Sequence, residues 1–231
     1  MTSRRDFVLA TALTALFANK VVAKEIQGRI NWPEFQAEMT KLANTAAKGQ
    51  ISNAEVVKRG MEYLRQLDIN LPAFKQAVDA SYESGNQYWL WQRLIKLQNI
   101  NGGILNIAND QLVQLHDHPG AVGLVRIISG ETEVWQFDEV EEKKEIDGQN
   151  IVRLVRTSHT ILRAGDTAVL TPTKGNIHAL KSISKECRML DFFIPPYDRS
   201  QRSWYQPITE NWFNKIQITC MKISQNDHSI T

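Results

Sequence analysis

The chain has 231 residues, of which 42% are hydrophobic and 23% are charged, an ordinary globular composition that is long enough to bury one sizeable core. Its formal net charge of +2 includes no dense Lys/Arg patch, so the composition argues against a nucleic-acid-binding protein. Its two cysteines are too few for the disulfide framework of a small secreted domain.

Residues 1–23 carry the pattern of an export signal. Arg4 and Arg5 come before an apolar stretch at 7–18, which is shorter than the roughly 20 residues that span a bilayer, and the segment 21–23 offers a small-residue cleavage site. The sequence therefore predicts a twin-arginine signal and a periplasmic location; the alternative is a short helix with two chance arginines. Cleavage would remove three positive charges and one negative charge, leaving a neutral mature chain without a stable membrane span.

Residues 24–100 are predicted to be helical and to pack on the rest of the chain. Pro33 stands where a first helical turn tolerates proline, apolar residues follow at helical spacing, and Gly49 ends this helix. A second helix begins with a capping box that starts at Ser52.

Two further helices are expected, one after Pro72 and one through the segment YWLWQRLIKLQ at 88–98. Apolar stripes on these helices predict packing against the protein's own core. The alternative is a helix that binds a membrane surface or a partner.

From about residue 101 the hydrophobic pattern becomes short β-prone runs separated by Gly, Pro and Asn/Asp turn signals. Many short strands at nearly regular spacing predict an antiparallel sandwich or barrel over 101–231. The expected strands are 104–108, 112–118, 121–129, 132–137, 151–157, 167–170, 177–183 and 187–194.

The histidines indicate a metal site. His116 and His118 form a His-x-His pair, and in a strand the side chains of residues i and i+2 point to the same face, so both imidazoles can reach one ion. His178 opens an apolar run after a Pro-x-x-Gly turn and is the candidate third ligand. Imidazole binds Zn, Cu, Ni and Fe, so these ligands alone do not select the metal.

The spacing around these histidines resembles the two motifs of cupin barrels. The resemblance implies a mainly β fold, the double-stranded β-helix or jelly-roll barrel, preceded by the helical region. Where many cupins place a glutamate ligand this chain has Gly123, which has no side chain to bind a metal. A site of three neutral imidazoles would leave a divalent ion its full charge and favour an anionic ligand such as a thiolate.

Three segments together resemble the family of cysteamine dioxygenase and plant cysteine oxidase: HDHPG at 116–120, GNIH at 175–178 and LDFFIPPY at 190–197. The resemblance implies a non-haem Fe(II) thiol dioxygenase, which converts a small thiol to its sulfinic acid with both atoms of O2. It also implies that His116, His118 and His178 bind the iron. The substrate could be cysteamine, cysteine, 3-mercaptopropionate or an N-terminal cysteine.

The resemblance further implies that Asp191 and Tyr197 act near the iron. A carboxylate can accept a hydrogen bond from a substrate ammonium, and a phenol can donate one to bound oxygen. Asp191 could instead cap a loop, and Tyr197 could simply close the mouth of the barrel.

The sequence leaves other residues open. Arg126 is expected to face solvent, although simple strand alternation would point it inward as a carboxylate clamp. Tyr205 matches the end of the family pattern, but Trp204 stands near where some members carry a cysteine, so a Cys–Tyr crosslink is in doubt. Cys187 is expected in the core, while the role of Cys220 is open.

His159 and His228 have no ligand spacing and are expected on the surface. We expect a monomer, with a small thiol and O2 as its partners. Two other functions fit a metal cupin: an isomerase or lyase that uses Zn, Mn or Ni as a Lewis acid, and a barrel that binds a small ligand without turnover.

Overall fold

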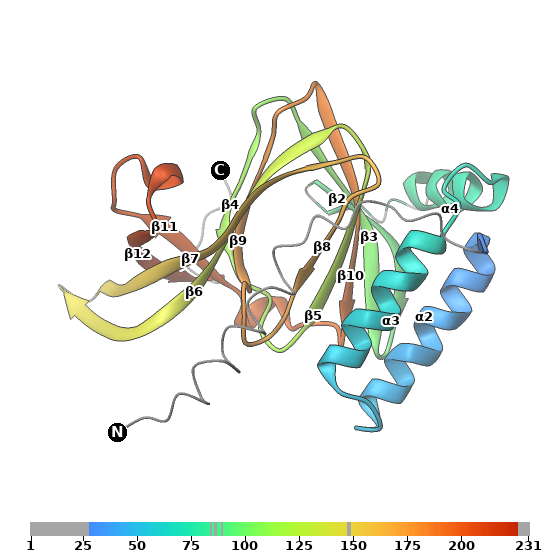
Figure 1. Cartoon of the computed structure of the whole chain (residues 1–231), viewed down its shortest axis with the longest axis horizontal. Coiled ribbons are helices and arrows are strands. Elements are labelled where there is room, and N and C mark those ends of the chain that lie inside the picture. The colour runs from blue at the N-terminus through green and yellow to red at the C-terminus, as the bar shows by residue number, and fades with distance from the viewer. Residues whose placement is uncertain (1–27, 84, 86, 89, 147–148, 226–231) are drawn as a thin grey trace, which may run out of the picture.

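The structure is a computed structural model that describes residues 28–83, 85, 87–88, 90–146 and 149–225. Three helices form a layer beside a β-sandwich, whose two sheets lie roughly face to face (Figure 1). The predicted twin-arginine signal at 1–23 and the predicted surface histidine His228 lie outside the described residues.

The helical layer contains α2 (Trp32–Ala47), α3 (Asn53–Gln66) and α4 (Pro72–Glu83). Asn31 and Glu34 form a reciprocal capping box at the start of α2, and Gly49 follows its end with a positive φ of 67°, which favours glycine. Ser52 accepts a hydrogen bond from the Glu55 amide, 3.3 Å away, at the start of α3. The predicted start and end of the first helix and the predicted start of the second are therefore found.

The fourth predicted helix is wrong, because its residues form β1 (Gln87–Tyr88) and β2 (Trp91–Leu97). Strand β2 pairs with β3 (Ile100–Ala108), and a register shift lies between Arg93 and Ile95. This irregularity interrupts the two-residue alternation of a strand, so the apolar residues recur at intervals that imitate a helix. Tertiary pairing with β3 decides the conformation.

The eight runs predicted as strands all form strands. Besides β1 and β2, the strands that the sequence did not predict are the C-terminal pair β11 and β12. The complete set after β3 is β4 (Leu112–His116), β5 (Val122–Ser129), β6 (Glu131–Ile146), β7 (Gln149–Arg163), β8 (Thr167–Leu170), β9 (Ile177–Ser182), β10 (Glu186–Ile194), β11 (Ser203–Pro207) and β12 (Gln217–Ser224). The hairpin of β6 and β7 is longer than expected and projects beyond the sandwich (Figure 1).

The strands form two antiparallel groups. One sheet has the order β1-β2-β3-β10-β5-β8, and the other group has the order β11-β12-β7-β6-β9-β4 and closes through the pairing of Trp204 with His116. This is the expected mainly β jelly-roll arrangement, preceded by helices. Its closed arrangement brings the ends of β4 and β9, which are distant in sequence, next to each other.

Two faces of the first sheet have different roles. On strand β10, Leu190, Phe192 and Ile194 point outward into a core shared with α2, α3 and α4. Met189 points the other way, into a core between the two sheets that also includes Val134 and Leu180 of the second group. The helices therefore support the strand whose inner face lines the interior of the barrel.

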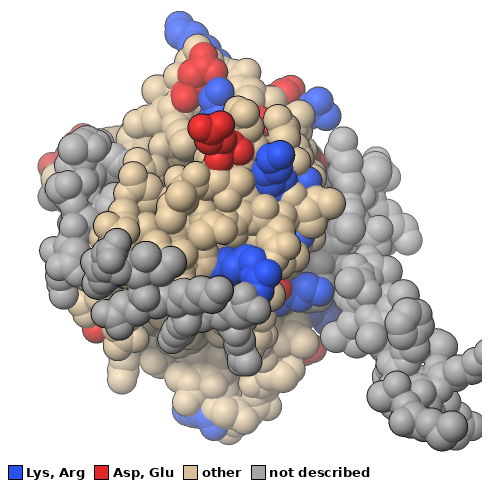
Figure 2. All heavy atoms as spheres, turned by 90° about the vertical axis from the view of Figure 1, so that its left-hand side faces the viewer, with Lys and Arg blue, Asp and Glu red and all other residues tan. Residues whose placement is uncertain are grey.

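The surface shows scattered charge. On the face in Figure 2, described Lys and Arg side chains alternate with Asp and Glu side chains and do not merge into one basic patch. Within the described ranges, no helix combines the length and the apolar character that crossing a membrane requires.

Candidate metal centre

A cavity of about 70 Å³ lies between the two sheets. A water molecule needs roughly 10–15 Å³ of such volume, so the cavity has room for several waters or one small molecule. Most of its lining is apolar, and its polar side chains are those of the three predicted histidine ligands and of Asn101, Thr132, Gln136, Asp191, Tyr197, Arg199 and Arg202.

The structure brings His116, His118 and His178 together. His116 ends β4, His178 lies opposite it in register at the start of β9, and His118 follows in the loop after β4. One ring nitrogen from each residue lies within 4.8 Å of the other two. Two nitrogens bound at about 2.1 Å to one ion can be at most about 4.2 Å apart, so a small inward movement would give three bonds to a single metal.

Burial keeps the three histidines neutral. It lowers the pKa values of His116 and His118 well below 6.5 and lowers the pKa of His178 to about 4. The Nδ1 atoms of His116 and His178 lie 2.7 and 3.1 Å from the carbonyl oxygens of Gln114 and Asn176. Because a carbonyl only accepts, these Nδ1 atoms carry the protons, and the Nε2 lone pairs are available for an ion.

The loop that carries His118 is held from two sides. The Asn176 side chain accepts a hydrogen bond from the His118 amide at 3.0 Å and donates one to the His118 carbonyl at 3.2 Å. The Asp117 carboxylate accepts hydrogen bonds from the Ser203 amide at 2.7 Å and the Tyr205 hydroxyl at 3.0 Å. These contacts position His118 relative to His178. Sequence reasoning did not identify Asn176 or Asp117 in this role.

Gly123 lies on the inner face of β5, since it has the same strand parity as the cavity residues Val125 and Ile127. A Cβ atom at this position would come within 2.9 Å of the Leu170 side chain, which also lines the cavity. The space into which a side chain at position 123 would project is therefore filled by Leu170. Among the described residues, the candidate metal-binding group contains only the three histidines.

Asp191 and Tyr197 both line the cavity. Burial raises the pKa of Asp191 to about 7, although the charge of Arg202 opposes this shift, and the Asp191 Oδ1 atom has no hydrogen-bond partner. The Tyr197 ring lies edge-on to the His118 ring at 4.5 Å, and its hydroxyl accepts a hydrogen bond from Arg202. The structure therefore places both predicted residues in the same cavity as the histidines, with Tyr197 in contact with His118.

Arg126 faces neither solvent nor the cavity, so the expectation of a solvent-facing side chain is wrong. Its guanidinium donates to the carbonyls of Leu64 and Leu67, at 2.6 and 2.7 Å, at the C-terminal end of α3. A cation at this end of a helix satisfies carbonyls that have no partner within the helix. The sequence could not show this contact, because it depends on how α3 packs on β5.

Arg202 and Arg199 are cavity residues that sequence reasoning missed. Arg199 opens a short 3-10 helix (Arg199–Gln201) between β10 and β11, and Arg202 follows it. Neither strand alternation nor an α-helical period indicates there which side chains point inward. The Cζ atom of Arg202 lies 5.2 Å from the centre of the Tyr197 ring and 5.4 Å from the centre of the Trp204 ring. The only signal available was their position directly after the LDFFIPPY segment.

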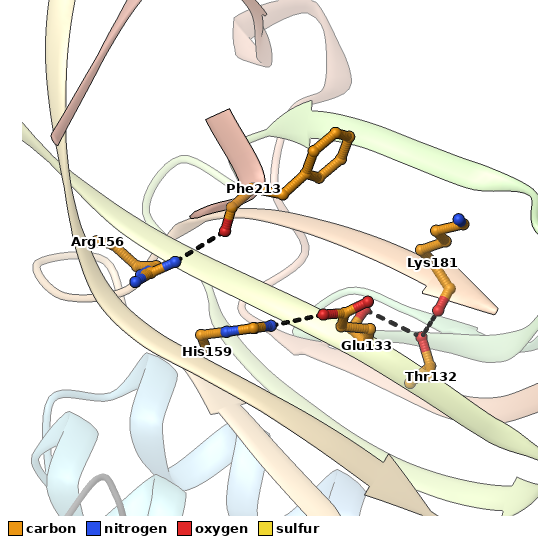
Figure 3. A network of polar contacts seen from close by, with 6 residues as sticks. All are labelled: Thr132, Glu133, Arg156, His159, Lys181 and Phe213. Atoms are coloured by element: carbon orange, nitrogen blue, oxygen red, sulfur yellow. Dashed lines mark hydrogen bonds and ion pairs between the residues drawn. The ribbon is translucent and has the colours of Figure 1, made fainter. Parts of the chain in front are cut away.

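Several other residues lie outside the cavity. Tyr205 contacts Asp117, and the buried Cys187 and Cys220 have pKa values raised by burial to about 11 and about 12, so neither is a reactive thiolate. His159 is exposed on β7, where its imidazole meets the Glu133 carboxylate at 2.7 Å (Figure 3). It is separate from the three-histidine group.

Comparisons with known proteins point to one family. The PCO_ADO family model matches residues 61–229. The chain is 25% identical over 123 residues to "Probable 2-aminoethanethiol dioxygenase" of Dictyostelium discoideum, covering 51% of this chain and 56% of that protein. It is 22% identical over 169 residues to 2-aminoethanethiol dioxygenase of Mus musculus, covering 66% of each. The chain thus spans between about half and two thirds of these relatives.

Solved structures with similar folds include an oxalate oxidase in complex with the substrate analogue glycolate, with 20% identity, 42% of each chain covered and a TM-score of 0.33. Another is an uncharacterized protein with a double-stranded β-helix domain from Klebsiella pneumoniae. It is 19% identical, with 46% of this chain and 75% of that chain covered and a TM-score of 0.33.

Proposed function

The chain belongs to the PCO_ADO family, and on that premise we propose that it is a non-haem Fe(II) thiol dioxygenase. The proposed reaction joins one thiol and one O2 to give one sulfinic acid: sulfur supplies four electrons, and both oxygen atoms end on sulfur. The observation that carries the proposal is a buried group of three neutral histidines without a carboxylate ligand. The name 2-aminoethanethiol dioxygenase, borne by two relatives, supports the choice of a thiol substrate.

The residues present fit such an ion. In His116 and His178, the Nδ1 atom donates to a backbone carbonyl, which leaves the Nε2 atom of each ring to bind the ion. His118 would be the third ligand. When bound, iron would supply the redox chemistry that lets O2 react with a thiolate sulfur. Because three neutral ligands leave its charge uncompensated, the site favours the thiolate over the thiol form of a substrate.

The other cavity residues bind and orient the reactants. Phe193 stacks on His118 at 4.4 Å and, with Leu170, excludes water from the side of the histidines. The Tyr197 hydroxyl accepts from Arg202, so its own proton is free to be donated to oxygen or sulfur in the cavity. Because the site would hold the two reactants side by side, the reaction between them would no longer need a bimolecular encounter. This proximity is the main source of rate enhancement available to such a site.

Oxygen uptake tests the proposal. Purified protein loaded with iron is expected to consume O2 with at least one of cysteamine, cysteine, 3-mercaptopropionate or a peptide with N-terminal cysteine, and to form one sulfinate per O2. The His178→Ala variant should lose both iron and uptake. Activity that persists without O2, or with Zn, Mn or Ni in place of iron, would support the isomerase or lyase alternative; ligand binding without turnover would support the binding protein.

We propose in addition that the protein is exported to the periplasm by a twin-arginine signal at residues 1–23. The Arg4-Arg5 pair, the short apolar stretch and the small residues at 21–23 support this location. Such a route carries folded proteins, which would allow the metal to be bound before export. Replacement of both arginines by lysine should leave the protein uncleaved in the cytoplasm, as measured by fractionation, whereas unchanged export would refute the proposal.

A further inference from the structure

The turn before His178 contains a buried glycine, Gly175, whose φ is 61°. Glycine has more conformational freedom to lose on folding than any other residue, so its conformation depends on the contacts that fix it. Asn176 follows directly and serves two histidines: its side chain holds the backbone of His118, and its carbonyl oxygen lies 3.1 Å from the Nδ1 atom of His178. The conformation of Gly175 therefore sets the position of the residue that orients both histidines.

Two side chains of β6 hold Gly175. The Oδ1 atom of Asp138 accepts a hydrogen bond from the Gly175 amide at 2.5 Å. The side-chain amide of Gln136 donates to the Gly175 carbonyl oxygen at 3.2 Å. These two backbone groups belong to the peptide units before and after the glycine, and each peptide unit is planar, so both dihedral angles of Gly175 are constrained.

Gln136 is itself fixed in place. Its amide nitrogen also donates to the carbonyl oxygen of Val169 in β8 at 3.0 Å, so both of its hydrogens are used. The pairing of β6 with β9 puts Gln136 directly opposite His178, and both residues line the cavity. Because β8 belongs to the first sheet and β9 to the second group, Gln136 links the two beside a histidine of the metal centre.

We propose that Gln136 and Asp138 are positioning residues of the metal centre, which act through Gly175 on two of the histidines. Neither belongs to the group of side chains that could hold the ion. Loss of a residue that orients a metal ligand usually lowers metal affinity by about 10- to 100-fold. Because these two act through the turn, the lower end of that range applies to each. The inference rests on the metal-binding part of the proposed function and adds two residues to it.

Co(II) binding tests the inference without thiol or O2. Co(II) binds imidazole as Fe(II) does, its visible absorption depends on the ligand geometry, and competition with a chelator gives its affinity. Gln136→Met keeps the length of the side chain but removes its donors, so it should weaken Co(II) binding by about 10-fold and change the spectrum. Asp138→Ala should do the same. Asp138→Asn keeps the Oδ1 acceptor and should bind Co(II) within about 3-fold of the wild type.

A double variant and two controls complete the test. Gln136→Met with Asp138→Ala should weaken binding by less than the product of the two single losses, because both side chains act on one glycine. Gln50→Met and Asp79→Ala make the same substitutions at exposed positions of the helical region and should match the wild type. Circular dichroism and thermal melts of the metal-free proteins ensure that affinities are compared between folded chains.

Three results would overturn the inference. These are an unchanged Co(II) affinity and spectrum in both single variants, whether or not their melting temperatures fall, single losses that multiply in the double variant, and equal affinities of Asp138→Ala and Asp138→Asn. The last comparison decides alone if Gln136→Met does not fold. Oxygen uptake by the iron-loaded wild type is scored separately. Absence of uptake with the expected Co(II) results refutes only the dioxygenase proposal, whereas a wild type that binds neither Co(II) nor iron refutes both.

Discussion

Replacing Asn176 by alanine should damage the metal site without touching a ligand. The Asn176 amide holds both backbone groups of His118, accepting from its N–H at 3.0 Å and donating to its C=O at 3.2 Å. Each such hydrogen bond contributes about 0.5–1.5 kcal/mol net, and a buried group left without a partner costs about 1–3 kcal/mol. The free energy of unfolding should therefore fall by about 2–3 kcal/mol. Metal affinity should fall by about 10- to 100-fold, the usual effect of losing a residue that orients a ligand.

Two measurements check this prediction. Urea unfolding of the metal-free protein, followed by tryptophan fluorescence, gives the stability change, and competition with a chromophoric chelator gives the metal affinity. Asn99→Ala is the matched control, because it removes an exposed amide that donates to Asn44 at 2.9 Å and should change the stability by less than about 0.5 kcal/mol. If Asn176→Ala lost stability but bound metal as tightly as the wild type, the argument that this amide positions His118 would be refuted.

Three other predictions concern separate parts of the molecule. Arg126→Met should lower the free energy of unfolding, measured in urea, by about 2–4 kcal/mol, because two carbonyls at the end of α3 lose their hydrogen-bond donor. Its affinity for thiols should stay unchanged, since Arg126 does not line the cavity. A large change in thiol affinity would contradict that placement. The raised pKa of Asp191, about 7 against 3.8, means that the folded state holds this proton more tightly than the unfolded state. Its contribution to stability is therefore greatest below pH 4 and is lost as the pH rises to 7, so the stability of the metal-free wild type relative to Asp191→Asn should fall by up to about 4 kcal/mol over that window; a flat difference would be the contrary result. Removal of the metal by a chelator should lower the stability by about 2.7 kcal/mol when the free metal had been at 100 times its dissociation constant, and a thermal melt that does not respond to the chelator would argue against metal binding by these histidines.

The histidine group was predictable from spacing along the chain, although local rules do not place every member. His116 ends β4, and the turn before His178 puts that residue at the start of β9, opposite His116. The expected strand 112–118 stops at His116, so the i and i+2 rule does not place His118, whose loop is held by Asn176. Gly123 was informative through its spacing from His118, which matches the resemblance to the cupin motif; simple alternation from His118 would have turned position 123 outward, whereas it lies on the inner face of β5. Each of these inferences depends on spacing within a few residues of the chain.

Other features depend on contacts that no local pattern encodes. The segment 88–98 has a spacing of apolar residues that suits a helix, and only its pairing with β3 makes it a strand. Arg126 is turned toward α3 by carbonyls about 60 residues away in the sequence. Arg202 enters the cavity from an irregular segment, where side-chain direction is set by its contacts with Tyr197 and Trp204 rather than by a period.

The three histidines and Asp191 are held by different parts of the fold. His116 and His178 face each other across paired strands of one group, so backbone hydrogen bonds fix their spacing. Asp191 lies on β10 of the opposite sheet, and the outer face of that strand packs on the helices, with the Phe192 ring 5.3 Å from that of Phe35 in α2. A change in the helical layer would therefore shift Asp191 relative to the histidines while leaving their mutual distances intact.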